Sequence, residues 1–169
     1  MKKLIALVLS LLAVASLVAG CSSGKGTTVN SGEKSVTFSL LSSPASLDPA
    51  TTTDGHSLMV ETQLFSMLVE SKGGTSNEIK PDIAESWEIS EDGLTYTFKL
   101  RDDVYFHNGK LLTADDVVYT FNRVMTEPYT SYYAAPIKSV EATDEHTFVA
   151  HLNYPFADFL TLIGGIYFG

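Results

Sequence analysis

Apolar and polar residues alternate along several short stretches of the chain, as they do in half-buried β-strands. Residues 36–40 alternate in this way and predict a first strand. Residues 83–89 and 95–100 alternate on either side of Asp92-Gly93, a pair typical of tight turns. This arrangement predicts a β-hairpin.

Further alternation follows later in the chain. Residues 104–106 are expected to extend the sheet, and residues 107–110 carry another turn signal. Residues 137–141 and 147–152 predict a second hairpin, with the apolar side chains of its second strand facing inward.

Helical patterns separate these strands. Residues 57–70 are largely apolar with a thin polar stripe, which predicts a mostly buried helix. Thr113 is placed to cap a helix whose apolar residues recur up to residue 125, and Pro128 stops it. Residues 155–160 are expected to begin another helix.

The first residues have the pattern of an export signal. Lys2 and Lys3 precede an apolar run over residues 4–18, which is shorter than the ~20 residues of a membrane span. The small residues before Cys21 resemble a bacterial lipobox. That resemblance implies a signal peptide over residues 1–20, with lipid on the Cys21 thiol and on its new amino terminus.

Two other interpretations of Cys21 are an uncleaved membrane anchor and a catalytic nucleophile. No other cysteine is present, so the chain has no internal disulfide. Residues 21–34 are rich in Ser, Gly and Thr and predict a flexible tether between the membrane and a folded body.

The net charge of the 169-residue chain is −9. An acidic surface disfavours nucleic acid as a partner, because phosphates repel it. The charge is compatible with cationic or zwitterionic ligands, and equally with a role in solubility alone.

Five segments together resemble the family 5 extracellular solute-binding proteins, which are the dipeptide, oligopeptide and nickel receptors of ABC importers. Their order and spacing agree with that family from about residue 36 onward. The segments are Ser-Leu-Asp-Pro at 46–49, Ile-Lys-Pro-Asp-Ile-Ala-Glu-Ser-Trp at 79–87, Asp-Gly-Leu-Thr-Tyr-Thr-Phe-Lys-Leu-Arg at 92–101, Phe-His-Asn-Gly at 106–109 and Leu-Thr-Ala-Asp-Asp-Val at 112–117.

The resemblance implies an α/β fold of two lobes, like that of the type II periplasmic binding proteins. Family members are much longer, so it also implies that this chain is an N-terminal fragment. Residues 35–60 would begin lobe I, with its first strand, and residues 61–169 would form an extra α+β subdomain that is incomplete at its C-terminal end.

The function implied is capture rather than catalysis, with no cofactor. Such a receptor binds a peptide or other small solute outside the cytoplasmic membrane, closes about a hinge and docks on permease subunits driven by a cytoplasmic ATPase. Alternatives are a receptor for nickel or another solute, a surface lipoprotein without a transport role, and a lipoprotein hydrolase.

The resemblance places Thr53, Asp54 and Gly55 at positions that contact the ligand backbone in peptide-binding members. Asp54 would attract a cationic group, and Gly55 would permit close approach. The alternative is a loop that leads into a helix, with Asp54 or Ser57 as its cap.

Tyr129 and Tyr132 resemble a tyrosine-rich segment that lines the pocket in some members, the alternative being packing within the subdomain. Adjacent aspartates at 102–103 and 115–116 do not face each other, which favours turn and cap roles over acid–base chemistry. The four histidines lack helical metal-ligand spacing, so no metal site is expected.

Overall fold

The computed structural model describes residues 36–71 and 78–169. The predicted signal peptide, Cys21 and the whole predicted tether lie outside these residues. Residues 40–169 form one compact unit, and residues 36–39 are assigned to a separate N-terminal unit.

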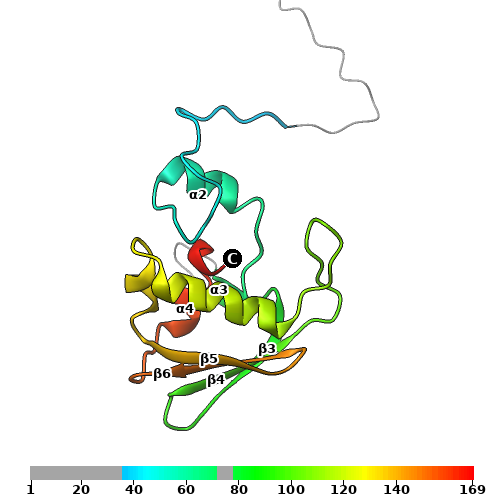
Figure 1. Cartoon of the computed structure of the whole chain (residues 1–169), viewed down its shortest axis with the longest axis vertical. Helices are drawn as coiled ribbons and strands as arrows, with labels where there is room; N and C mark the ends of the chain where they lie inside the picture. Colours follow the sequence, from blue (N-terminus) through cyan, green and yellow to red (C-terminus); the bar gives the residue numbers. More distant parts are fainter. Residues whose placement is uncertain (1–35, 72–77) are drawn as a thin grey trace, which may run out of the picture. The chain divides into compact units, whose positions relative to one another are not determined.

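A four-stranded antiparallel sheet organises the unit, with strand order β3-β4-β6-β5 (Figure 1). It consists of the two predicted hairpins: β3 (Ala84–Ile89) pairs with β4 (Thr95–Leu100), and β5 (Ile137–Asp144) pairs with β6 (Thr147–Leu152). Strands β4 and β6 join the hairpins at the centre of the sheet. Both hairpin predictions are therefore confirmed.

One face of this sheet is covered by helix α3 (Ala114–Thr126), which lies across the strands in Figure 1. Phe98 and Phe148 are cross-strand partners on the covered face and are fully buried. The Phe121 ring of α3 lies 4.7 Å from the Phe148 ring and 4.7 Å from the Phe168 ring. These four aromatic side chains form the centre of the core.

Helix α3 begins and ends where the sequence predicts. The Asp116 carboxylate accepts hydrogen bonds from the Thr113 backbone N–H and hydroxyl, both at 3.0 Å, which gives the first turn a capping arrangement. Glu127 is extended, as residues before a proline usually are, and Pro128 follows outside the helix.

The expected helix over residues 57–70 is only partly present. Helix α2 spans Gly55–Glu61, and the later apolar residues enter strand β1 (Val69–Ser71), which pairs with β2 (Ile79–Pro81). The Met67 N–H donates to the Asp82 carboxylate at 2.8 Å, which helps to hold the chain away from a helical path. Long-range pairing therefore overrides the local helical pattern.

Two expected strands are absent. Residues 36–40 are irregular, because a strand needs a hydrogen-bonded neighbour and none of the described residues supplies one, and residues 36–39 are exposed. Residues 104–106 form a single bridge between Tyr105 and Leu111 rather than a fifth strand. The turn expected after them is present, with Gly109 at a positive φ of 83°.

Short helical segments complete the unit. A 3-10 helix, η1 (Ser131–Ala134), follows α3. Helix α4 spans Phe159–Ile163 and therefore begins a few residues later than predicted, after a turn at Phe156. It is followed by the 3-10 helix η2 (Ile166–Phe168). Within the described ranges, no helix is long and apolar enough to cross a membrane.

Candidate ligand-binding site

Residues 46–55 run from the Ser-Leu-Asp-Pro segment to Gly55, the first residue of α2, and we call them the ligand loop. The Asp48 backbone carbonyl accepts a hydrogen bond from the Thr51 N–H at 3.0 Å, which makes a turn directly after the Ser-Leu-Asp segment. The buried Ser57 hydroxyl accepts hydrogen bonds from Ala45 N–H at 2.9 Å and Ser46 N–H at 3.3 Å. The start of the loop is thereby held against α2.

The Asp54 side chain caps helix α2. Its carboxylate accepts hydrogen bonds from the backbone N–H groups of His56, at 3.2 Å, and Ser57, at 3.0 Å. Hydrogen bonding from the Ser57 side chain and backbone, followed by the His56 N–H, lowers the pKa of Asp54. The capping alternative for Asp54 is therefore confirmed, and contact with a ligand stays a prediction.

The neighbours of Asp54 are open to solvent. Thr53 and Gly55 are exposed. A Cβ atom added at Gly55 would meet no heavy atom within 4 Å, and the residue does not have a positive φ. The fold of the described residues therefore does not itself require glycine at this position.

An ion pair joins the ligand loop to α3. The Arg123 guanidinium binds both oxygens of the Asp48 carboxylate, with 2.9 Å between Nη1 and Oδ1 and a second bond from Nη2 to Oδ2. Asp48, through its hydrogen bond and its charge, raises the pKa of Arg123 against the effect of burial. Nothing in the sequence pairs these residues, because they are 75 positions apart.

A second contact joins the loop to the turn after α3. The Thr130 hydroxyl donates a 2.6 Å hydrogen bond to the Ala50 carbonyl, and both residues are buried. Thr130 lies between the two predicted ligand tyrosines in the sequence. The structure therefore brings the tyrosine turn, residues 129–132, to the ligand loop.

Both tyrosines expose most of their side chains. Tyr129 is 66% exposed and Tyr132 is 61% exposed, so neither belongs to the core. The Tyr132 ring contacts Tyr133, with ring centres 3.9 Å apart, and Tyr133 stacks on Tyr167 at 4.2 Å. One face of the Tyr132 ring therefore packs against Tyr133, as part of an aromatic stack. Contact of Tyr129 or Tyr132 with a ligand stays a prediction.

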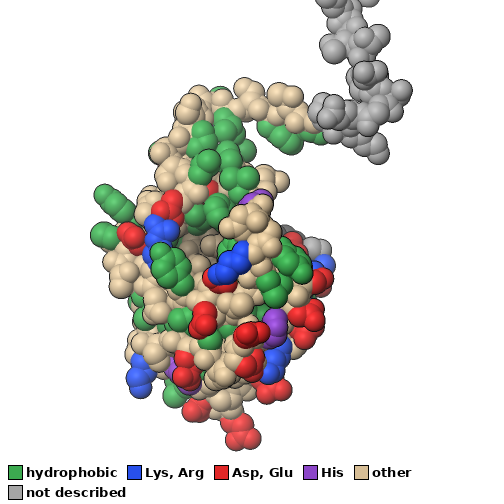
Figure 2. All heavy atoms as spheres, turned by 45° about the vertical axis from the view of Figure 1, so that its right-hand side comes forward, with side chains coloured by type: hydrophobic (Ala, Val, Ile, Leu, Met, Phe, Trp, Pro, Cys, Tyr) green, Lys and Arg blue, Asp and Glu red, His purple; other side chains and the backbone are tan. Residues whose placement is uncertain are grey.

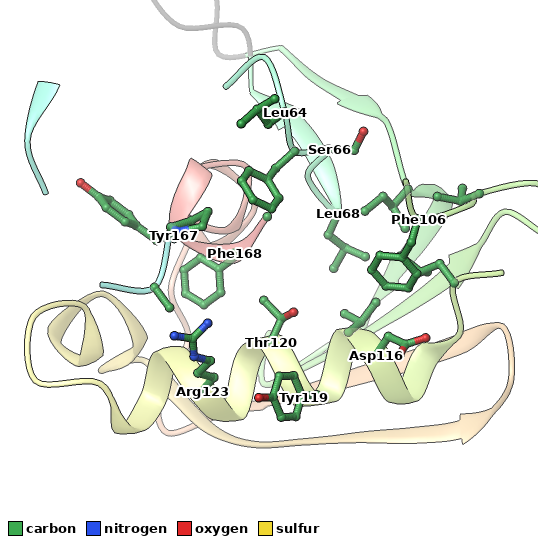
Figure 3. Close-up of a pocket in the computed structure, with 18 of the residues that line it drawn as sticks. Leu64, Ser66, Leu68, Phe106, Asp116, Tyr119, Thr120, Arg123, Tyr167 and Phe168 are labelled. Atoms are coloured by element: carbon green, nitrogen blue, oxygen red, sulfur yellow. The ribbon is translucent and has the colours of Figure 1, made fainter. Parts of the chain in front are cut away.

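A cavity of about 610 Å³ is lined in part by residues 47–50 of the ligand loop and is shown in close-up in Figure 3. Figure 3 shows Thr120 and Arg123 rising from α3, with Leu68 and Phe168 on the opposing segments. The lining of the cavity is mainly apolar, and its polar residues include Asp48, His107, Asp116 and Arg123. None of the five predicted ligand residues lines this cavity.

A carboxyl group without a hydrogen-bond partner lies in α2. Glu61 is fully buried, and both of its carboxyl oxygens, like the buried Thr52 hydroxyl, lack a hydrogen bond to any described residue. Burial raises the pKa of Glu61, the Thr52 side chain beside it opposes the rise, and the charges of Asp48 and Asp54 add to it.

Acidic side chains predominate over basic ones on the part of the surface shown in the lower half of Figure 2. Within residues 36–71 and 78–169, no three His, Cys, Asp or Glu side chains lie close enough together to hold a metal ion. The polar groups near the ligand loop are instead a carboxylate, hydroxyls and exposed tyrosines, which suit hydrogen bonding to a polar organic solute.

Comparisons with known proteins agree with the fold. The family model for "Bacterial extracellular solute-binding proteins, family 5 Middle" matches residues 78–168, more than half of the chain. Heme-binding protein A of Haemophilus influenzae is 40% identical over 142 residues, with 72% of this chain and 26% of the relative covered. Di/tripeptide-binding protein 1 of Pseudomonas aeruginosa is 35% identical, with 70% and 26% covered.

Among solved structures, the periplasmic binding protein DppA of Helicobacter pylori, in complex with the peptide STSA, has a TM-score of 0.64 and 38% identity. That match covers 74% of this chain and 28% of the other. The chain therefore spans about a quarter of the length of its matched relatives, with the α/β fold of a part of a periplasmic binding protein. It belongs to the bacterial extracellular solute-binding proteins of family 5, a family of solute receptors rather than enzymes.

Proposed function

We propose that this chain is part of the substrate-binding component of an ABC importer that captures di- or oligopeptides outside the cytoplasmic membrane. The complex of the similar Helicobacter pylori protein with the peptide STSA is the observation that carries this proposal. The di/tripeptide-binding relative from Pseudomonas aeruginosa supports the same class of solute.

The exposed residues of the ligand loop suit a peptide. Gly55 leaves open space where a peptide backbone can approach, and Thr53 is accessible for hydrogen bonding. The Asp54 carboxylate is only partly exposed, yet its low pKa keeps it charged, so it would attract the amino group of a zwitterionic peptide. Tyr129 and Tyr132 would add contact area with few rotatable bonds.

We further propose that Cys21 carries lipid that anchors the protein on the outer side of the cytoplasmic membrane, where it delivers solute to permease subunits. The export signal before Cys21 supports this. Replacing Cys21 with Ser should abolish incorporation of a labelled fatty acid into the protein. Equal labelling of the Cys21→Ser variant and the unmodified protein would contradict lipid attachment at Cys21.

Haem is a second candidate solute, because the Haemophilus influenzae relative at 40% identity is a heme-binding protein. Peptide and haem differ in the groups they need: a peptide uses charged termini and backbone hydrogen bonds, whereas haem presents a large apolar ring. The two candidates therefore predict different responses to the same probes.

A thermal-shift assay separates these candidates. The sample is the mature product of the whole reading frame that contains this chain, and the probes are STSA, a set of di- and tripeptides, haem and nickel(II). A peptide present at a hundred times its Kd should stabilise the protein by about 2.7 kcal/mol. A shift with haem or nickel(II) alone would replace the peptide assignment, and no shift with any probe would favour a role without transport.

Two substitutions test the loop. Gly55→Val should weaken peptide binding while leaving stability nearly unchanged, because the added side chain meets open space in the fold. Thr62→Val, at the exposed far end of α2, is the control and should bind as the unmodified protein does. Equal affinities in both variants would remove Gly55 from the ligand site.

A further inference from the structure

The ligand loop is fixed to distant parts of the chain by the two contacts described above. Local bonds hold each of its ends: the Ser57 hydroxyl binds its start, and the Asp54 carboxylate caps α2. Its middle, by contrast, is fixed by side chains that lie 75 and 80 residues later in the sequence.

The first contact is bidentate, which fixes orientation as well as distance. The guanidinium of Arg123 holds both oxygens of Asp48, and the same carboxylate accepts a hydrogen bond from the Ala50 N–H at 3.3 Å. The Nε of Arg123 also lies 3.7 Å from Glu127, one turn further along α3. A lysine would keep the charge but lose the planar two-point geometry.

The second contact is buried. Thr130 and Ala50 are both inaccessible, so the 2.6 Å bond between the Thr130 hydroxyl and the Ala50 carbonyl is shielded from competing water. Thr130 belongs to the same short turn as Tyr129 and directly precedes η1, which carries Tyr132. A shift of the loop at Ala50 would therefore also shift the tyrosine turn.

We propose that Arg123 and Thr130 are positioning residues that hold the ligand loop and the tyrosine turn together as one preformed binding surface. This inference rests on the proposed function, because it assumes that these two segments contact the solute. Neither side chain needs to touch the solute. A surface held in its binding conformation loses less conformational freedom when the solute arrives, so it binds more tightly.

The test compares Thr130→Val, which removes the hydroxyl with little change in shape, with Thr130→Ser, which keeps it. Thr126→Val is the matched control, because among the described residues the Thr126 hydroxyl bonds only to carbonyls of its own helix. Each variant is made in the mature product of the whole reading frame. The Kd for STSA is measured well below the melting temperature, and hydrogen exchange is followed at the Thr51, His56 and Ser57 amides.

Positioning predicts that Thr130→Val raises the Kd about tenfold, a change of ~1.4 kcal/mol, and speeds exchange at those three amides. The Kd values of Thr130→Ser and Thr126→Val for STSA should lie within about twofold of the Kd of the unmodified protein. If Thr130→Val lowers the melting temperature but changes neither the Kd nor exchange, Thr130 has only a structural role and the inference is overturned.

The proposed function can fail separately. If the unmodified protein does not bind STSA or any di- or tripeptide, hydrogen exchange alone decides whether Thr130 positions the loop. Faster exchange in Thr130→Val than in Thr126→Val would support positioning, and equal exchange would overturn it. If Thr130→Val does not fold, Arg123→Lys is measured instead, with the same readouts and the same two outcomes.

Discussion

The buried carboxyl of Glu61 makes a testable prediction about stability. Glu61 is fully buried, and neither carboxyl oxygen has a hydrogen-bond partner in the described part of the chain. Methionine has a similar length and no charge, so Glu61→Met would fill the same space without a polar group. We predict that this substitution stabilises the protein.

The magnitude follows from the two unpaired oxygens. Leaving a buried polar group without a partner costs about 1–3 kcal/mol, and a charged group costs more. We therefore expect Glu61→Met to raise the free energy of unfolding by about 1–3 kcal/mol at neutral pH. The Thr52 side chain lies beside this carboxyl and favours its charged form, so the variant loses that interaction and the gain lies toward the lower end of this range.

The same group makes stability depend on pH. Burial raises the pKa of Glu61 in the folded protein, whereas the unfolded chain has the ordinary value of about 4.3. Between these two values the folded state binds more protons than the unfolded state, so stability falls as pH rises. Each unit of difference between the two pKa values corresponds to about 1.4 kcal/mol. Glu61→Gln cannot lose a proton and should not show this part of the fall.

The assay is urea unfolding followed by circular dichroism at several pH values from 4 to 8, with Glu91→Gln, an exposed carboxyl in a turn, as the control. The difference between Glu61→Gln and the unmodified protein should grow with pH, while Glu91→Gln should follow the unmodified protein. If Glu61→Met is less stable than the unmodified protein, and Glu61→Gln follows the unmodified protein at every pH, the buried carboxyl does not destabilise the fold and the prediction is wrong.

Three further substitutions test the fold by thermal or urea unfolding. Phe121→Ala should lower the free energy of unfolding by about 3–5 kcal/mol, because the Phe121 ring packs between two other buried rings. The control, Asn122→Ala at an exposed position, should change this free energy little, and an equally small effect of Phe121→Ala would place Phe121 outside the core. Gly93→Ala should cost about 1–2 kcal/mol, because Gly93 has a φ of 68°, and an unchanged stability would mean that the turn differs. Thr113→Ala should cost about 1 kcal/mol by removing the hydroxyl that binds Asp116, and no loss would argue against this cap.

The elements with strong local signals could be predicted from the sequence. Thr113 and Pro128 mark the ends of α3, and Asp92-Gly93 marks the turn of the first hairpin. Each signal acts through neighbouring residues, so no knowledge of the rest of the fold is needed. This is why α3 and both hairpins agree with the expected residue ranges.

Elements that depend on distant partners could not be predicted in the same way. The apolar run after α2 suits a helix or a strand, and the pairing of β1 with β2 decides between them. Residues 36–40 alternate like a strand, but alternation alone does not supply a neighbour.

The candidate site likewise depends on contacts between distant residues, which the sequence alone does not reveal. The family resemblance points to Asp54 and to the tyrosine turn as separate features, and the sequence leaves open whether Asp54 caps α2. Their connection through Arg123, Asp48 and Thr130 is visible only in three dimensions, because those contacts span 75 and 80 residues.

Peptide binding by the protein that contains this chain is the property on which the proposed function depends. Titration calorimetry of the mature product of the whole reading frame with STSA, and with a set of di- and tripeptides, tests it most directly. We expect saturable binding of at least one peptide with a stoichiometry of about one, as one solute site per receptor requires. Saturable binding of haem together with no detectable heat from any peptide would contradict it.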